Sequence, residues 1–112
     1  MRNILMQDRR SCEVYKKYIK EQLPVRYPTI DNTARRVGMP VRTLQRRLKE
    51  SGLSYSELVE QTRYELACRL LDMPGAKMAA VARALGYNDP SSFSRAFRRW
   101  TGMSPRAYRS RD

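Results

Sequence analysis

Histidine is absent from this chain of 112 residues, and cysteine is scarce. The absence of histidine removes the commonest general base and the commonest metal ligand of proteins. The two cysteines, Cys12 and Cys68, lie far apart, each among helix-forming residues. Two thiols alone cannot complete a tetrahedral zinc site, and a disulfide is not expected in a cytoplasmic protein. The sequence therefore predicts no catalytic residue, no metal site and no cofactor, and we do not expect an enzyme.

Long hydrophobic runs are also absent. No apolar segment approaches the roughly 20 residues that a membrane-spanning helix needs. The short run Ile4-Leu5-Met6 is followed by polar and charged residues, and not by the small residues of a signal-peptide cleavage site. No segment has the alternation of polar and apolar residues that is typical of a strand. We therefore expect an all-α protein that stays in the cytoplasm and has no membrane partner.

Acidic residues are outnumbered by basic ones. The chain has 11 Asp and Glu against 23 Lys and Arg, which gives a formal net charge of +12 and a pI of about 10.4. A charge of this size favours a polyanionic partner. The simpler interpretation is a basic surface that only keeps the protein soluble. The chain also contains an internal repeat, and the basic residues are concentrated on the same segment of each copy. This placement favours nucleic acid as the partner.

This repeat occupies residues 30–54 and 78–104. Each copy has a short apolar pattern of helical period, a glycine, a gap of a few residues and a longer apolar pattern of helical period. Corresponding residues include Ile30 and Met78, Ala34 and Ala82, Arg35 and Arg83, Gly38 and Gly86, Leu44 and Phe93, Arg46 and Arg95, Leu48 and Phe97, and Gly52 and Gly102. The arrangement is typical of a helix-turn-helix, whose second helix can lie in the major groove of DNA. Two such units predict sequence-specific binding of double-stranded DNA.

Apolar spacing and the residues at segment ends predict seven helices. We expect them at residues 11–23, 29–38, 41–51, 54–71, 77–85, 89–100 and 104–110. Residues 1–10 have no clear period and are expected to form a tail or an interdomain linker. Residues 11–112 are expected to form one double helix-turn-helix domain. Its first unit covers about 29–51, the linker helix about 54–71 and the second unit about 77–100.

Local side-chain pairs support these bounds. The N-caps that we expect are Thr29, Ser54, Asp89 and Ser104. Ser54 and Glu57 have the spacing of a capping box. Glu65 and Arg69 have the spacing of an i,i+4 ion pair on the linker helix. Val14 is expected on the buried face of the first helix.

The second helix of each unit has a buried side and an outward side on a helical wheel. Leu44 and Leu48 lie on the buried side of the first helix, and Phe93 and Phe97 on that of the second. The outward residues expected to contact bases are Arg42, Gln45, Arg46, Ser91, Ser94 and Arg95. Nearer the C-terminal ends, the residues expected to contact phosphates are Lys49, Arg98 and Arg99. Arginine can donate two parallel hydrogen bonds to guanine, and glutamine can donate to and accept from adenine. A solvated charged face is the alternative, which the matching positions in both units disfavour.

Residues 86–105 read Gly-Tyr-Asn-Asp-Pro-Ser-Ser-Phe-Ser-Arg-Ala-Phe-Arg-Arg-Trp-Thr-Gly-Met-Ser-Pro and are followed by Tyr108 and Arg109. This run closely resembles the C-terminal signature of the AraC/XylS family of bacterial transcription regulators. Residues 42–48, Arg-Thr-Leu-Gln-Arg-Arg-Leu, are similar to the family's first unit. The resemblance covers about residues 11–110. It implies seven helices in two helix-turn-helix units joined by a long linker helix, which recognise promoter DNA through two adjacent major grooves. It also implies base contacts by the same six residues that the helical wheel places outward.

Two positions depart from the family pattern. Pro40 stands where the family usually has a serine that caps the first recognition helix, so we expect a weaker cap and a shifted helix start. Thr33 occupies a position that is commonly valine, as it is in the second unit at Val81.

Most members of the family carry a further domain that binds an effector or mediates dimerisation, and 112 residues cannot also hold it. We therefore expect the C-terminal DNA-binding domain of a larger effector-regulated protein, with a stand-alone short regulator as the alternative. RNA polymerase is a further partner that the resemblance implies, and the nucleoid is the expected location. A non-specific basic or architectural nucleic-acid-binding module would keep the charge, but would not need two matching faces. The sequence leaves open whether transcription is activated or repressed.

Overall fold

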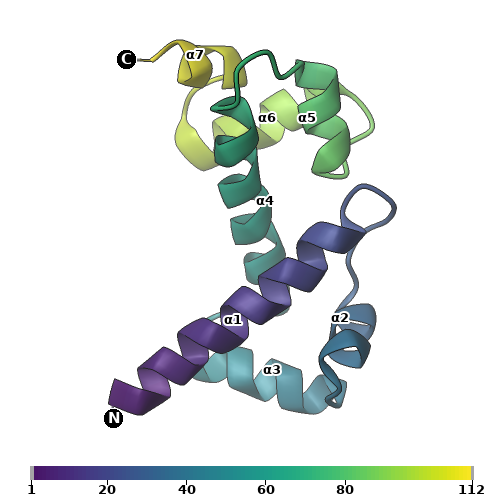
Figure 1. The fold of residues 1–112 in the computed structure, drawn as a ribbon, viewed down its shortest axis with the longest axis vertical. Coiled ribbons are helices and arrows are strands. Elements are labelled where there is room, and N and C mark those ends of the chain that lie inside the picture. Colours follow the sequence, from purple (N-terminus) through teal and green to yellow (C-terminus); the bar gives the residue numbers. More distant parts are fainter. Residues whose placement is uncertain (1, 112) are drawn as a thin grey trace.

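The structure, a computed structural model, describes the backbone of residues 2–111 and the side chains of residues 12–111. This part of the chain contains seven α-helices and no strand, as the sequence predicted. The helices are α1 (Arg2–Gln22), α2 (Ile30–Val37), α3 (Val41–Glu50), α4 (Tyr55–Leu71), α5 (Met78–Ala84), α6 (Pro90–Thr101) and α7 (Pro105–Ser110). Figure 1 shows α4 between two lobes, with α1, α2 and α3 around one end and α5, α6 and α7 around the other. The predicted architecture of two helix-turn-helix units and a linker helix is confirmed.

The first helix is longer than predicted. It was expected to begin at residue 11 but begins at Arg2, so residues 2–10, for which no helix was predicted, belong to α1. No proline or glycine interrupts residues 1–22. Adding a residue to an existing helix costs little once its first turn has formed, even where no apolar period marks a buried face. A role of this segment as an interdomain linker stays a prediction.

In the described part of the chain, four helices begin with a side-chain cap, as predicted. The capping residues are Thr29 at α2, Ser54 at α4, Asp89 at α6 and Ser104 at α7. At α4 the capping box is complete, because Ser54 Oγ accepts from the Glu57 backbone N–H at 3.2 Å and Glu57 Oε1 accepts from the Ser54 N–H at 2.8 Å. The start of α3 after Pro40 has no side-chain cap. The helix nevertheless begins at Val41, as the apolar spacing predicted, so the shifted start expected from Pro40 was wrong.

Each lobe has its own hydrophobic core. The buried residues of the first core are Tyr15, Ile19, Leu23, Ala34, Leu44, Leu48, Leu58 and Val59. Those of the second core are Ala67, Leu71, Val81, Ala82, Leu85, Phe93 and Phe97. Leu66, near the middle of α4, packs against both cores. The linker helix therefore contributes its first half to one lobe and its second half to the other.

A half-buried ion pair joins α1 to α4. The side chain of Lys16 is only 8% exposed, and its Nζ lies 3.0 Å from Oε1 and 3.2 Å from Oε2 of Glu65. Glu65 therefore pairs with Lys16 and not with Arg69, which corrects the prediction. Val14 was also misplaced: it is 44% exposed, because the buried side of α1 is centred on Tyr15 and Ile19. In both cases the crossing of α1 over α4 determines which residues are in contact. The spacing of residues within one helix gives no information on that crossing.

Thr33 is explained by a hydrogen-bond network in the first lobe. Its hydroxyl is fully buried, accepts from Gln22 Nε2 at 2.9 Å and lies 2.8 Å from the Tyr55 hydroxyl. The Tyr55 hydroxyl in turn donates to the carbonyl oxygen of Pro28 at 2.6 Å. Burial raises the pKa of Tyr55 to about 12, while the Thr33 hydrogen bond acts in the opposite direction. The threonine therefore joins α1, α2 and α4 where a valine would supply only packing.

Candidate nucleic-acid interface

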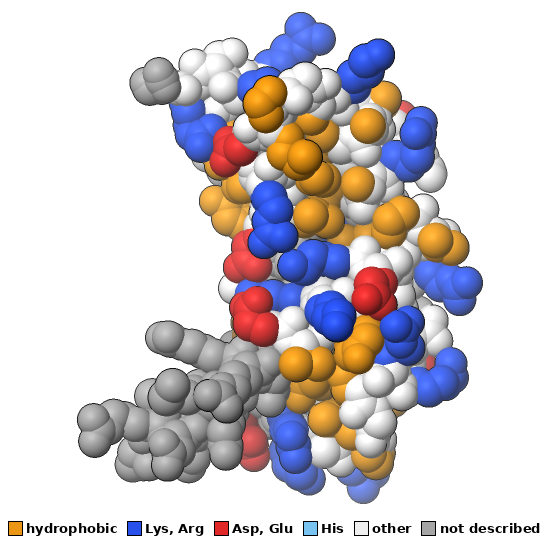
Figure 2. All heavy atoms as spheres, viewed as in Figure 1, with side chains coloured by type: hydrophobic (Ala, Val, Ile, Leu, Met, Phe, Trp, Pro, Cys, Tyr) orange, Lys and Arg blue, Asp and Glu red, His pale blue; other side chains and the backbone are white. Residues whose placement is uncertain are grey.

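Basic side chains are spread over the face of the molecule seen in Figure 2. They lie at both ends, along the right-hand edge, where Figure 1 places α2 and α5, and in the middle of the face beside acidic side chains. Acidic side chains are fewer on this face. Because the net charge is +12, the surface attracts polyanions as a whole, and the individual helix faces decide where a polyanion can be held.

The outward side of α3 presents four polar side chains. Leu44 and Leu48 are buried at i and i+4 and hold the opposite side of the helix against the first core. The four outward residues are Arg42, Gln45, Arg46 and Lys49, all of them exposed. Among the described residues, none of these four side chains has a hydrogen bond or an ion pair with another part of the chain. Their outward placement is as predicted, and their donors are free to meet a ligand.

The second recognition helix is built on a larger aromatic core. Phe93 and Phe97 are fully buried with their ring centroids 5.8 Å apart, and Phe97 also packs edge-on against Tyr108 of α7 at 5.3 Å. At the helix start, Asp89 Oδ1 accepts from the Ser92 backbone N–H at 2.8 Å. This hydrogen bond holds the pKa of Asp89 below its usual value. The carboxylate therefore stays ionised, where it complements the positive end of the helix dipole.

The outward side of α6 lines a groove of about 490 Å³. Its lining residues are Met78, Pro90, Ser91, Ser94, Arg95, Arg98, Ser104, Pro105 and Arg106. Four residues that the sequence predicted for DNA contact thus lie together: Ser91, Ser94, Arg95 and Arg98. Ser94 is half-buried and the other three are exposed. The guanidinium of Arg95 is partly engaged by its own helix, since Nη2 donates to Ser92 Oγ at 3.3 Å.

Arg99 lies apart from this set. It is exposed but does not line the groove. Burial raises the pKa of the Tyr87 hydroxyl, and the positive charges of Arg63 and, more weakly, Arg99 act in the opposite direction. A phosphate contact by Arg99 stays a prediction.

Arg106 and Met78 are groove residues that the sequence analysis missed. Arg106 lies in the first turn of α7 and is exposed, and Met78 begins α5. The helical wheel was drawn for the second helix of each unit and could not show that the starts of α5 and α7 adjoin α6. Ser104 and Pro105 predicted where α7 begins, but not that α7 lies beside the groove.

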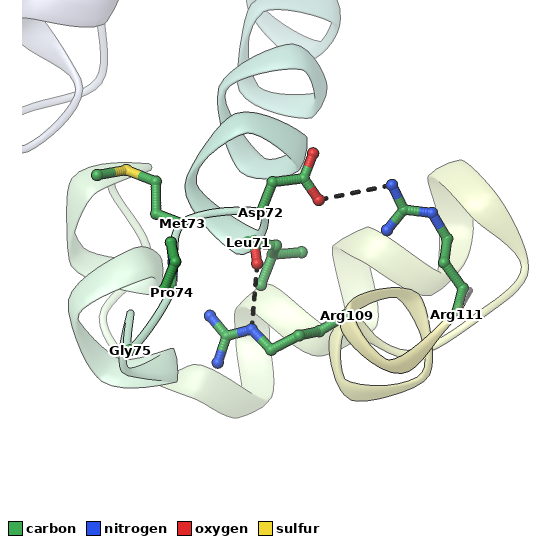
Figure 3. Close-up of a pocket in the computed structure, with 7 residues that line it drawn as sticks. All are labelled: Leu71, Asp72, Met73, Pro74, Gly75, Arg109 and Arg111. Carbon is green, nitrogen blue, oxygen red and sulfur yellow. Dashed lines mark hydrogen bonds and ion pairs between the residues drawn. The ribbon is translucent and has the colours of Figure 1, made fainter.

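A second cavity, of about 660 Å³, lies where α4 ends (Figure 3). Arg109 and Arg111 reach into it from the C-terminal segment of the chain. Arg109 Nε donates to the carbonyl oxygen of Leu71 at 3.1 Å, and Arg111 Nη2 lies 3.5 Å from Asp72 Oδ1. Cations at the C-terminal end of a helix complement its dipole and its unpaired carbonyl groups. The signature residue Arg109 is therefore a structural residue that docks α7 on the linker helix.

Two further features bear on the kind of site. Among the described residues there is no group of three or more Cys, Asp or Glu side chains that could hold a metal ion. No described helix is both long enough and apolar enough to cross a membrane.

The chain is similar to known proteins that contain a helix-turn-helix domain. A profile of the helix-turn-helix domain family matches residues 33–111. The chain is 37% identical over 90 residues to the HTH-type transcriptional regulator VqsM of Pseudomonas aeruginosa, which covers 80% of this chain and 28% of VqsM. It is 41% identical over 88 residues to the HTH-type transcriptional regulator VirS of Mycobacterium tuberculosis, which covers 79% of this chain and 26% of VirS. The chain thus spans about a quarter of the length of these curated relatives.

A solved structure extends the comparison to DNA. The chain resembles the DNA-binding domain of the global transcriptional factor AdpA, whose crystal structure contains a target DNA, with 29% sequence identity and a TM-score of 0.67. The match covers 88% of this chain and 89% of that one.

Proposed function

The chain belongs to the AraC-type helix-turn-helix family of DNA-binding transcription regulators, and we propose that it reads specific promoter DNA by placing α3 and α6 in two adjacent major grooves. The observation that carries this proposal is the matched pair of outward helix faces. The side chains of Arg42, Gln45 and Arg46 are exposed on α3 and have no hydrogen-bond or ion-pair partner among the described residues, and Ser91, Ser94 and Arg95 line one groove beside α6. The family consists of regulators and not of enzymes, so we assign the chain no catalytic reaction.

The length of the linker helix suits this binding mode. With 17 residues at ~1.5 Å per residue, α4 spans about 26 Å. The two recognition helices pack near its opposite ends, and the molecule is 40 Å long along its longest axis. Successive major grooves on one side of B-DNA are about 34 Å apart. One copy of the chain therefore reads two non-palindromic elements about one helical turn apart.

The two units divide the work unequally. The α3 face offers three long side chains that can discriminate base edges, whereas the α6 face offers two short serines and Arg95. We assign most of the base discrimination to the first unit. Lys49, Arg98 and Arg99 hold phosphates, which position the protein without reading the sequence.

The chain acts as one domain of a longer regulator. It spans about a quarter of the length of the relatives it matches, and a regulator of that length has room for an effector-binding or dimerisation domain. RNA polymerase is a partner of the whole regulator. Promoter DNA lies in the nucleoid, which is in the bacterial cytoplasm. The protein therefore works in the cytoplasm and is associated with the nucleoid when it is bound to DNA.

Selection of bound sequences from a random DNA pool tests the proposal. A consensus of two elements should emerge, and inserting about five base pairs between them should abolish tight binding, because half a helical turn moves one groove to the far side. Specific binding should also survive an excess of unrelated DNA that removes an electrostatic binder. No consensus and complete competition would establish the non-specific basic module instead.

Single substitutions test the assignment of the reading faces. Arg46→Ala and Arg95→Ala should each weaken specific binding by ~1–3 kcal/mol and relax the preference at one base position. Arg47→Ala is the matched control, since Arg47 is an exposed arginine of α3 that lies beside the buried stripe on the helical wheel. Unaltered base preference in both variants, or an equal loss of preference in the control, would refute the assignment.

A further inference from the structure

The two lobes meet at a close backbone contact as well as through α4. The turn between α5 and α6 packs against the end of α1, and a Cβ atom placed on Gly86 would lie 2.7 Å from the carbonyl oxygen of Leu23. Cβ atoms essentially never approach another heavy atom that closely, so only glycine allows the contact. A cleft of about 440 Å³ separates the remaining loop after α1 from α5. Close packing between these parts of the two lobes is therefore confined to a small area.

One arginine of the linker helix contacts both lobes in this area. Arg63 lies at the middle of α4, and its side chain is only 13% exposed. Its guanidinium carbon is 4.8 Å from the ring centroid of Tyr87, in the turn before α6, and 5.6 Å from that of Tyr27, in the loop before α2. Both distances are within the range of a cation–π interaction. A single guanidinium thus joins a loop of the first lobe to a turn of the second.

A carboxylate fixes this guanidinium and extends the contact to α6. Glu60 Oε2 accepts from Arg63 Nη1 at 3.2 Å. The other oxygen of the same carboxylate, Oε1, accepts from Trp100 Nε1 at 3.1 Å. Trp100 belongs to α6, whose opposite side lines the groove described above. We call the set Tyr27, Glu60, Arg63, Gly86, Tyr87 and Trp100 the inter-unit junction.

The junction lies at the middle of α4, between the two hydrophobic cores. The two hydrophobic cores are separate clusters that share contacts with Leu66. A single helix of 17 residues can bend, and a small rotation at its middle becomes a larger displacement of the recognition helices near its ends. Contacts from α4 to both lobes at its midpoint oppose that rotation.

We propose that Arg63 is a positioning residue that sets the rotation and spacing between α3 and α6, and thereby the spacing between the two DNA elements that one molecule can read. This inference rests on the proposed function, and it assigns Arg63 no contact with DNA. A rigid connection lets the second helix bind at a high effective concentration once the first is bound. Loosening the connection lowers that concentration and leaves each separate helix face unchanged.

Arg63→Met removes the charge and the planar group and keeps an aliphatic stem of similar length. We expect the affinity for the full site to fall on the order of tenfold, while affinity for a site with one element scrambled changes less than about twofold. The full-site preference for one spacing should also broaden when one base pair is added or removed. Arg69→Met is the matched control, because Arg69 is an exposed arginine of the same helix and its loss changes the net charge equally. It should keep the wild-type spacing preference.

A second variant distinguishes the loss of a junction contact from general destabilisation of the fold. Tyr27 is 50% exposed in a loop, so Tyr27→Ala should leave both cores intact and remove one contact of the guanidinium. It should reproduce the broadened spacing preference in a weaker form. Equal losses on full and single-element sites in both variants would overturn the proposal, because they indicate general destabilisation.

Residual dipolar couplings of the free protein test the junction without DNA. Backbone couplings from both lobes of the wild-type chain should fit one alignment tensor, and those of Arg63→Met should require two. A single tensor in the variant would overturn the proposal. If random-pool selection finds no DNA consensus, the proposed function fails while the couplings still decide whether Arg63 fixes the orientation of the lobes.

Discussion

The close approach of Gly86 to Leu23 leads to a quantitative prediction about stability. Gly86 has φ +89°, in the left-handed region that glycine adopts without strain. In Gly86→Ala, the added methyl group meets a backbone carbonyl oxygen at 2.7 Å. A carbonyl cannot rotate away as the end of a flexible side chain can, so the turn or the end of α1 must move.

Two costs add in this variant. Alanine in the left-handed region is strained by roughly 1–2 kcal/mol relative to glycine. Displacing packed backbone to admit one carbon costs about 1–3 kcal/mol more. We therefore expect Gly86→Ala to lower the free energy of unfolding by about 2–5 kcal/mol. Gly102→Ala isolates the first cost, because Gly102 has φ +81° in the same lobe with no heavy atom within 4 Å of the added carbon.

Urea denaturation followed by circular dichroism at 222 nm measures both variants. Gly102→Ala should lose only the strain energy, and Gly38→Ala, with φ +73° and open space around it, should behave the same way in the first lobe. The difference between Gly86→Ala and Gly102→Ala measures the close approach itself. If the two variants unfold with free energies within about 0.5 kcal/mol of each other, the lobes do not depend on this contact and the reasoning fails.

Three further predictions follow from single sites. Thr33→Val keeps the shape of the side chain but removes the acceptor of Gln22 Nε2, and should lower the free energy of unfolding by about 1–2 kcal/mol in urea denaturation. An unchanged free energy of unfolding would mean that the hydrogen-bond network contributes no stability beyond that of packing. Tyr55, whose pKa is raised from 10.0 to about 12 in the folded chain, keeps its proton when the unfolded chain has lost it, so stability should fall between pH 10 and 12. Tyr55→Phe should make that decline shallower in denaturation measured at each pH, and an unchanged decline would contradict the assignment. Lys49→Ala and Arg98→Ala should each reduce the slope of log affinity against log salt concentration by about one unit without altering the preferred DNA sequence, whereas an unchanged slope would exclude a phosphate contact.

The helices and the outward faces could be predicted because their causes are local. Apolar residues at i and i+4, such as Leu44 and Leu48, mark the buried side of a helix by its period alone, and the opposite side follows. Capping residues such as Ser54 and Asp89 act within three residues of their partners. The internal repeat added the division into two units. The start of α1 could not be predicted in this way, because a helix without a breaker extends past the residues that show a period.

Long-range pairing was decided by the tertiary structure alone. The crossing of α1 over α4 gives Glu65 the partner Lys16, 49 residues away, in place of Arg69 on its own helix. Arg63 looked like any other charged residue of the linker helix, but the return of two distant turns to the middle of α4 buries it between Tyr27 and Tyr87. Arg106 joins the groove of α6 only because α7 folds back beside it. The sequence by itself thus determined which residues form helices and which sides of them face outward, through interactions within a turn or two. Which sides meet depends on helix crossing and loop return, which no local spacing encodes.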